Sequence, residues 1–397
     1  MLKILYYSTA YTASHGGSNH SKAFVKFAKE NAAVSEVNIF PSHRSPILQV
    51  KNNSSVFKNK LLSSKLLLPF RLYKRNKLNI QSLYSAIDQY KPNVLVVRMD
   101  NNFFQLKHVK LKYPNLILVT EVNGSSFDES FKNIVFKSYF QNKEKEAFSL
   151  CDLNFFVSSF LRDRVMGDMI NYSRDLVNHN GFDDTLFVKV ENDKSNKEAL
   201  GIAKDMKVIG YLGTLDLHKK MHLFIDAYAK VSKVHKNVVA LVVGGGPALE
   251  EIESYVGNKG LSDKFYFTGQ VEHKDVHKYL KAFDVAVHHA ANDYMSPLKI
   301  FEYLALQLPV IGPDIPAVRE IFEDRKHLLL TAPTVSDIEE KISLLLNHSE
   351  LAYSIAKNGN EYVKANFTWR ENVERVIGAI QKIHPIEDFT VNSKATA

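Results

Sequence analysis

Two lysines and a glutamate stand where they could hold a phosphate group and a neighbouring sugar. Lys299 and Glu302 lie in SPLKIFEYLALQLPVIG near the start of an expected helix, and Lys219 lies in an earlier loop between a strand and a helix. Lysine is a compact cation that meets phosphate as a point charge. A carboxylate one helical turn away could accept both hydroxyls of a ribose. These residue types together predict a site for a nucleotide.

The helix start in residues 284–312 favours an anion. This segment is expected to form a strand, a polar loop, a helix and a second strand. Ser296 is expected to cap the helix and Pro297 to occupy its first turn, so that the amides of Leu298 and Lys299 point outward. Taken alone, the motif is explained equally well by an ordinary amphipathic helix with solvated charges.

Three further segments show the same alternation of strand, loop and helix. VIGYL is expected to be a buried strand that leads into Gly213 and Thr214, with Lys219 following before a helical segment. ALVVGGGPALEEIESYV predicts a strand, a glycine turn and a helix, and KFYFTGQVEHKDVHKYLKAFDVAVHHA predicts a strand, a loop, a helix and a strand. Ligands of such parallel sheets bind beyond the carboxyl ends of the strands.

In order and character these four elements resemble the C-terminal half of the retaining GT-B glycosyltransferases of family 4. HGGSNHSKAF resembles the glycine-rich first loop of that family, FVSSFLRDRV and NHNGFDDTLF its domain-closing stretch, and FTWRENVERV its C-terminal helix. The resemblance therefore covers nearly the whole chain. It implies an α/β protein of two Rossmann-like, doubly wound domains that face a central cleft, and a hexosyltransferase of cell-surface polysaccharide biosynthesis.

The resemblance also implies a donor site for a nucleotide-diphosphate sugar. Lys219 and Lys299 would stabilise the departing diphosphate, and Glu302 would hold the ribose. Lys219 and Glu302 are therefore predicted as catalytic residues on the donor side. The positions that match the donor-binding motifs are Gly17, Gly213, Thr214, Lys219, Val271, Glu272, Tyr294, Ser296, Leu298, Lys299 and Glu302. Val271 and Glu272 match the place where relatives hold the nucleobase by backbone contacts.

Two positions depart from the family pattern. The family usually has two glutamates separated by seven residues, and Glu302 matches the second of them. Tyr294 stands at the first position, which normally touches the donor sugar. Thr214 stands where many relatives carry an arginine that pairs with the diphosphate, so Lys219 and Lys299 would carry more of that charge.

The expected acceptor side lies in VTEVNGSSFDES, which carries Glu121 and Asn123. A carboxylate there could position or deprotonate an acceptor hydroxyl, so Glu121 is predicted as the third catalytic residue. The alternative is a loop carboxylate exposed to water. The histidines lack metal-ligand spacing, and neither a metal nor another cofactor is expected. A nucleotide-sugar epimerase on the same fold and a non-catalytic nucleotide-sugar-binding protein remain as alternatives to a transferase.

Length and composition agree with two globular domains. Of its residues, 45% are hydrophobic and 24% are charged, as is typical of soluble globular proteins. A chain of 397 residues is too long for one ordinary hydrophobic core, so two domains are expected. We expect an acceptor-side domain over residues 1–184, a nucleotide-sugar domain over 185–366, and a C-terminal helix with a tail over 367–397 that returns to the first domain. The single cysteine excludes an internal disulfide, and no secretory or membrane-spanning stretch is evident, so the cytoplasm is expected.

Positive charge is concentrated in residues 37–87, which contain nine lysines and arginines and no acidic residue, whereas the whole chain carries a net charge of +8. The bases alternate with apolar residues, a mixture that suits the surface of an anionic membrane. A domain helix with snorkelling lysines is the alternative. The expected membrane contacts, at the inner face of the cell membrane where a glycan or lipid-linked acceptor would lie, are Lys58, Lys60, Lys65, Lys74 and Arg75. No nucleic-acid partner is expected, because no recognition motif accompanies the stretch.

Overall fold

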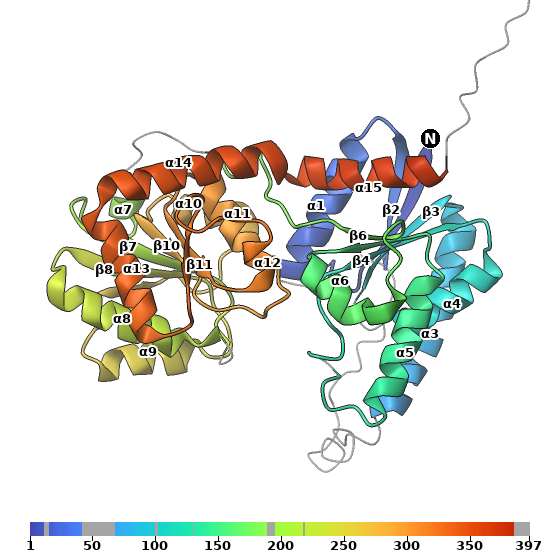
Figure 1. Ribbon diagram of the computed structural model, residues 1–397, viewed down its shortest axis with the longest axis horizontal. Coiled ribbons are helices and arrows are strands. Elements are labelled where there is room, and N and C mark those ends of the chain that lie inside the picture. Colours follow the sequence, from blue (N-terminus) through green and yellow to red (C-terminus); the bar gives the residue numbers. More distant parts are fainter. Residues whose placement is uncertain are drawn as a thin grey trace, which may run out of the picture.

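The computed structural model consists of two α/β domains, each built on a six-stranded parallel sheet with helices packed around it (Figure 1). The residues that the structure describes are 1–11, 16–41, 68–99, 102–129, 131–188, 195–216 and 219–384. The doubly wound architecture predicted from the strand and helix pattern is confirmed.

The N-terminal sheet has the strand order β2-β1-β3-β4-β5-β6. Its strands are β1 (Leu2–Tyr7), β2 (Val34–Phe40), β3 (Val94–Met99), β4 (Ile117–Val122), β5 (Leu153–Phe156) and β6 (Asp175–Val177). Its helices are α1 (Gly16–Glu30), α3 (Leu68–Tyr90), α4 (Phe103–Lys112), α5 (Lys137–Ser149) and α6 (Ser159–Met166), followed by a 3-10 turn over Gly167–Met169. Every residue of β3 and β4 is buried, as expected of parallel strands covered on both faces.

The C-terminal sheet has the order β12-β11-β10-β7-β8-β9. Its strands are β7 (Lys207–Leu212), β8 (Val238–Val243), β9 (Phe265–Phe267), β10 (Val285–Val287), β11 (Val310–Pro313) and β12 (Leu329–Thr331). Its helices are α7 (Ser195–Ala199), α8 (Met221–Val234), α9 (Leu249–Asn258), α10 (His273–Leu280), α11 (Leu298–Ala305), α12 (Pro316–Arg319), α13 (Val335–Asn347) and α14 (Ser349–Asn366). Because β7 and β10 are neighbours, the loops that carry Lys219 and the start of α11 meet at one edge of the sheet.

The helices α14 and α15 (Trp369–Ile383) run nearly end to end across both domains (Figure 1). Thr368 caps α15 by accepting a hydrogen bond from the amide of Glu371 at 3.1 Å. The apolar face of α15, with Trp369 and Val376, packs into the core of the N-terminal domain beside Phe24 of α1. The chain therefore crosses to the second domain and returns to complete the first.

Polar contacts also join the domains around the start of α6. The amide and hydroxyl of Ser159 donate to the carboxylate of Glu320 at distances between 2.9 and 3.1 Å, which places an anion at a helix N-terminus. The side chain of Asn180 donates to the carbonyl of Ser296 at 2.7 Å. The loop that leads into α11 is thus held by the N-terminal domain.

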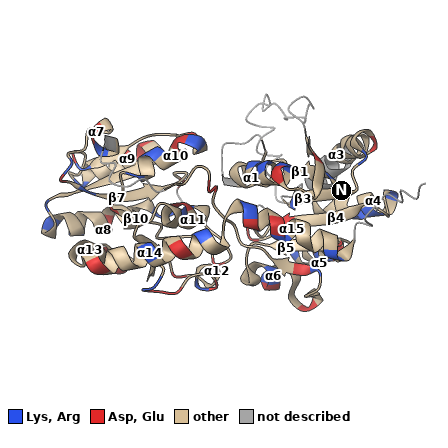
Figure 2. Ribbon diagram, turned by 90° about the horizontal axis from the view of Figure 1, so that it is seen from above, with Lys and Arg blue, Asp and Glu red and all other residues tan. Residues whose placement is uncertain are grey.

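Charges are mixed on the described helices of both domains, where Lys and Arg lie close to Asp and Glu (Figure 2). Of the predicted membrane contacts, Lys58, Lys60 and Lys65 lie outside the described residues, and Lys74 and Arg75 fall within α3. Among the described helices, none combines the length and the apolar character needed to cross a bilayer.

Candidate functional site

The loops that follow β7 and β8 pack backbone against backbone. The amide of Gly213 donates to the carbonyl of Val243 at 3.0 Å, and the amide of Leu215 donates to that of Gly245, also at 3.0 Å. A Cβ atom on Gly246 would lie 2.3 Å from the carbonyl oxygen of Leu215, which no side chain tolerates. The glycine run therefore allows these two loops to meet at the carboxyl edge of the sheet.

Lys219 and Lys299 form a pair of cations at this edge. A Cβ atom on Gly213 would lie 2.6 Å from Nζ of Lys299, so the glycine leaves room for the amine at the end of β7. Burial lowers the pKa of Lys299 to about 7, and the charge of Lys219 lowers it while that of Glu302 raises it. Burial likewise lowers the pKa of Lys219, opposed by Asp216 and Glu129. Within the described chain neither amine forms an ion pair with a carboxylate.

The start of α11 lies one residue later than predicted. Pro297 is the N-cap residue, and Ser296 does not cap the helix. The hydroxyl of Ser296 instead accepts a hydrogen bond from the amide of Asn180 at 3.3 Å, because the N-terminal domain holds this loop. The amides of Leu298 and Lys299 stand at the open end of the helix, where they and the helix dipole favour an anion.

Glu302 is buried and is held by a histidine that the sequence analysis did not identify. Its Oε1 lies 2.7 Å from Nε2 of His273, the first residue of α10. Burial opposes a positive charge on His273, but the hydrogen bond and the charge of Glu302 outweigh it and raise the pKa of the histidine. The other oxygen of Glu302 has no hydrogen-bond partner in the described chain. Nearby, Val271 is partly exposed, and Glu272 is exposed and pairs with Lys274 at 2.6 Å.

His288 and His289 follow β10 and are both buried. Nε2 of His289 faces the carbonyl of Lys220 at 3.1 Å, and burial lowers the pKa of His289 to about 4. Burial and the charges of Lys299, His289 and Lys219 lower the pKa of His288. Both imidazoles are therefore neutral near pH 7, and the positive charge of this region resides on the lysines.

On the acceptor side, Glu121 is neither in a loop nor exposed to water, contrary to the alternative considered above. It lies within β4 with 4% of its surface exposed. One carboxylate oxygen accepts a hydrogen bond from the hydroxyl of Tyr6 at 2.7 Å, and the other lies 3.2 Å from Nε2 of His20. Asn123 is partly exposed just beyond the strand. Gly17, predicted in a loop, lies in the first turn of α1, because the helix begins at residue 16.

The two positions that depart from the family pattern have different surroundings. Thr214 is exposed beside Gly213. Tyr294 is buried, and its hydroxyl donates to Oε1 of Glu129 in the N-terminal domain at 2.8 Å. Tyr294 thus reaches into the other domain.

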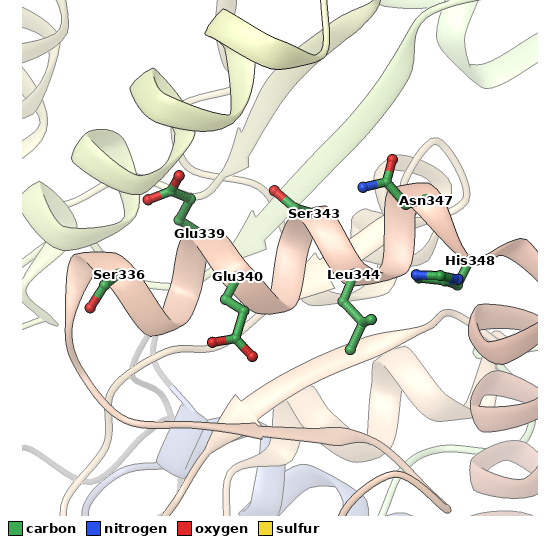
Figure 3. Close-up of a pocket in the computed structure, with 7 residues that line it drawn as sticks. All are labelled: Ser336, Glu339, Glu340, Ser343, Leu344, Asn347 and His348. Atoms are coloured by element: carbon green, nitrogen blue, oxygen red, sulfur yellow. The ribbon is translucent and has the colours of Figure 1, made fainter.

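A surface hollow lies along α13, apart from the predicted donor residues (Figure 3). Its lining residues are Ser336, Glu339, Glu340, Ser343, Leu344, Asn347 and His348. All of them belong to one helix or its C-cap, so they form a groove on its surface rather than a site between elements. Among the described residues there is also no group of three or more His, Cys, Asp or Glu placed to hold a metal ion.

The C-terminal domain carries a recognised sequence signature, since residues 192–362 match the family model described as glycosyl transferases group 1. The chain is also similar to an uncharacterized glycosyltransferase, MJ1069, of Methanocaldococcus jannaschii. The two are 23% identical over 311 residues, which cover 75% of this chain and 78% of that protein. These matches support a group 1 glycosyltransferase.

Solved structures share the architecture of the whole chain. Sucrose-phosphate synthase from Thermosynechococcus elongatus is 16% identical with a TM-score of 0.75, and the alignment covers 96% of this chain and 99% of that one. Anabaena HepE in complex with UDP-glucose is 17% identical with a TM-score of 0.71, over 96% and 100% of the two chains. At such identities the likeness shows the fold, and the predicted GT-B architecture is confirmed.

Proposed function

We propose that this chain is a glycosyltransferase that moves a hexose from a nucleotide-diphosphate sugar to a glycan or lipid-linked acceptor. The observation that carries the proposal is the pair formed by Lys219 and Lys299 at the open end of α11. The two cations repel each other, and Lys299 is partly neutral near pH 7. A bound diphosphate brings negative charge between the two lysines, which offsets their repulsion and favours the charged form of Lys299. HepE, which shares the fold, binds UDP-glucose.

The same residues suit the chemical step. Negative charge grows on the diphosphate as the glycosidic bond breaks, and groups that are fixed in advance around that charge stabilise the transition state. Lys219, Lys299 and the α11 amides supply this positive environment, and the free oxygen of Glu302 accepts hydrogen bonds from the ribose. We propose that the lysines make turnover independent of a metal ion.

The stereochemistry and the acceptor are proposed from the resemblance to family 4. The new bond would keep the configuration of the donor, and the product would enter a cell-surface polysaccharide. The basic stretch supports an acceptor at the cytoplasmic face of a membrane. Direct contact of Glu121 with an acceptor would require displacement of Tyr6 or His20, so its catalytic role stays a prediction.

The proposal is tested with a panel of UDP-glucose, UDP-N-acetylglucosamine and GDP-mannose. Thermal shift identifies the donor that binds, and release of the nucleoside diphosphate on addition of glycan or lipid acceptors measures transfer. Proton NMR of the product reports whether its anomeric configuration matches that of the donor. A nucleotide sugar that is epimerised without transfer would support an epimerase, and binding without any turnover would support a non-catalytic binding protein. Either result would refute the transferase.

A further inference from the structure

Tyr294 belongs to the C-terminal domain by its place between β10 and α11, yet its side chain is part of the N-terminal core. Only 4% of its surface is exposed, and it lies in one apolar cluster with Phe127, Phe131 and Val157. The hydroxyl of Ser158, the N-cap of α6, donates to the Tyr294 carbonyl at 3.0 Å. The ring of Tyr294 is therefore fixed by the opposite domain.

The phenol of Tyr294 orients a carboxylate. Its oxygen accepts a hydrogen bond from Nδ2 of Asn292 at 3.2 Å, so its own proton points to Oε1 of Glu129 at 2.8 Å. Burial and the hydrogen bond to Glu129 raise the pKa of Tyr294, which keeps the phenol protonated and a donor. The bond therefore sets the direction of the Glu129 side chain.

Glu129 is exposed, yet its position is defined on several sides. Its amide donates to the carbonyl of Ser125 at 3.1 Å, and a Cβ atom on Gly124 would lie 2.8 Å from its Oε1. The carboxylate is hydrogen-bonded to Tyr294, which stands in the loop that leads into α11, so it lies near the start of the helix that carries Lys299. In keeping with this position, its charge raises the pKa of Lys219. In the part of the chain that the structure describes, Oε2 of Glu129 has no hydrogen-bond partner.

The position of Glu129 indicates which chemical groups it can bind. A carboxylate repels a diphosphate, so it would weaken the site if both groups had to touch. A sugar attached to that diphosphate is neutral and carries hydroxyl groups, and a carboxylate with unused lone pairs accepts hydrogen bonds from hydroxyls. The geometry thus provides a cationic side for the diphosphate and an anionic side for the sugar.

We propose that Glu129 binds hydroxyl groups of the donor sugar and that Tyr294 is the positioning residue that holds its carboxylate. The inference rests on the proposed function, because a sugar reaches Glu129 only if the diphosphate lies on Lys219 and Lys299. It places a donor-sugar contact in the N-terminal domain, whereas Lys219, Lys299 and Glu302 lie in the C-terminal domain.

The test compares binding of a nucleotide sugar with binding of its parent diphosphate. UDP-glucose, UDP-N-acetylglucosamine and GDP-mannose are titrated by calorimetry beside UDP and GDP, and hydrolysis of the bound donor is followed as turnover. Glu129→Gln removes the charge, Tyr294→Phe removes only the hydroxyl, and Gly124→Ala pushes the carboxylate aside without deleting it. Glu320→Gln is the matched control, because it removes another carboxylate that joins the two domains.

Each of the three variants is expected to bind the parent diphosphate within about threefold of wild type, to bind the nucleotide sugar at least tenfold more weakly, and to hydrolyse it at least tenfold more slowly at saturation. The control should keep the wild-type ratio of the two affinities. Unchanged sugar affinity and turnover in Glu129→Gln, or equal weakening of both ligands, would overturn the role of Glu129 and leave the proposed function intact. Failure of the wild-type protein to bind any of these diphosphates would instead refute the proposed function and this inference with it.

Discussion

Binding of a nucleoside diphosphate should weaken steeply as pH rises above 7. The perturbed group is Lys299, whose pKa burial and the charge of Lys219 lower to about 7. A diphosphate restores the favourable surroundings of the ammonium, so the bound protein holds a proton that the free protein has partly lost. Affinity is therefore greatest below pH 7 and declines above it.

The magnitude follows from the charged fraction of Lys299 in the free protein. With a pKa of about 7, that fraction falls from about three quarters at pH 6.5 to about 3% at pH 8.5. The dissociation constant should rise about 25-fold over this interval, which corresponds to about 2 kcal/mol. Ionisation of the terminal phosphate of the nucleotide, near pH 6, opposes this by less than about twofold.

Calorimetry measures both the affinity and the proton. Titrations of UDP or GDP at pH 8 in two buffers that differ in ionisation enthalpy should report uptake of about 0.9 proton per nucleotide. The variant Lys299→Gln should bind weakly and show a flat profile between pH 6.5 and 8.5. A steep profile that survives in this variant would assign the effect to another group, such as His273. A flat profile in the wild-type protein would refute the electrostatic account of the lysine pair.

Three further perturbations separate the donor site, the core and the basic stretch. Glu302→Ala should weaken binding of the parent diphosphate at least tenfold in calorimetry, because charge-assisted hydrogen bonds to the ribose are each worth about 1.5 to 3 kcal/mol. The control Glu272→Ala, which changes an exposed carboxylate, should bind as the wild type does. Equal affinities of Glu302→Ala and the wild type would refute the ribose contact of Glu302. Burial raises the pKa of Glu144 to about 7, so the native state favours the neutral acid and loses stability as pH rises from about 4.5 to about 7. Glu144→Gln should therefore raise the free energy of unfolding by roughly 1 to 3 kcal/mol at pH 8 and leave it unchanged at pH 4.5, as measured by urea denaturation. Glu146→Gln, on the exposed face of the same helix, should leave the free energy of unfolding unchanged at both pH values. An identical response of the two variants would contradict the burial argument. Replacement of Lys58, Lys60, Lys65, Lys74 and Arg75 together by glutamine should abolish sedimentation with anionic vesicles at low salt, since each charge contributes about 1 kcal/mol of attraction. Equal pelleting of wild type and variant would refute the proposed membrane contact.

Much of the donor side could be predicted because its signals are local. Continuous apolar runs identify parallel strands, and a Ser-Pro pair before an amphipathic segment identifies the helix at Leu298. The neighbouring strands β7 and β10 bring the loop of Lys219 and the start of α11 to one edge of the sheet, as the alternation of strands and loops implied, and the charges of Lys219 and Glu302 both act on the pKa of Lys299.

The remaining contacts depend on residues that are distant in the sequence. Serine is a common cap residue, but the hydroxyl of Ser296 accepts a hydrogen bond from the amide of Asn180, which lies more than a hundred positions away in the sequence. Glu121 is equally a loop or a strand residue until Tyr6 and His20 are brought beside it by β1 and α1. Glu129 carries no local signal, because the role proposed for it depends on the hydrogen bond from Tyr294 of the other domain.

The return of α15 to the first domain has a consequence for biosynthesis. Trp369 and Val376 are buried in a core whose other members, such as Phe24 and Val96, emerge from the ribosome some three hundred residues earlier. Domains usually fold as units in the order in which they are translated. Here the N-terminal domain must wait, with an apolar face uncovered, until the second domain has been made. Because exposed apolar surface promotes aggregation, a chain that terminates before α15 is expected to aggregate more readily than the whole protein.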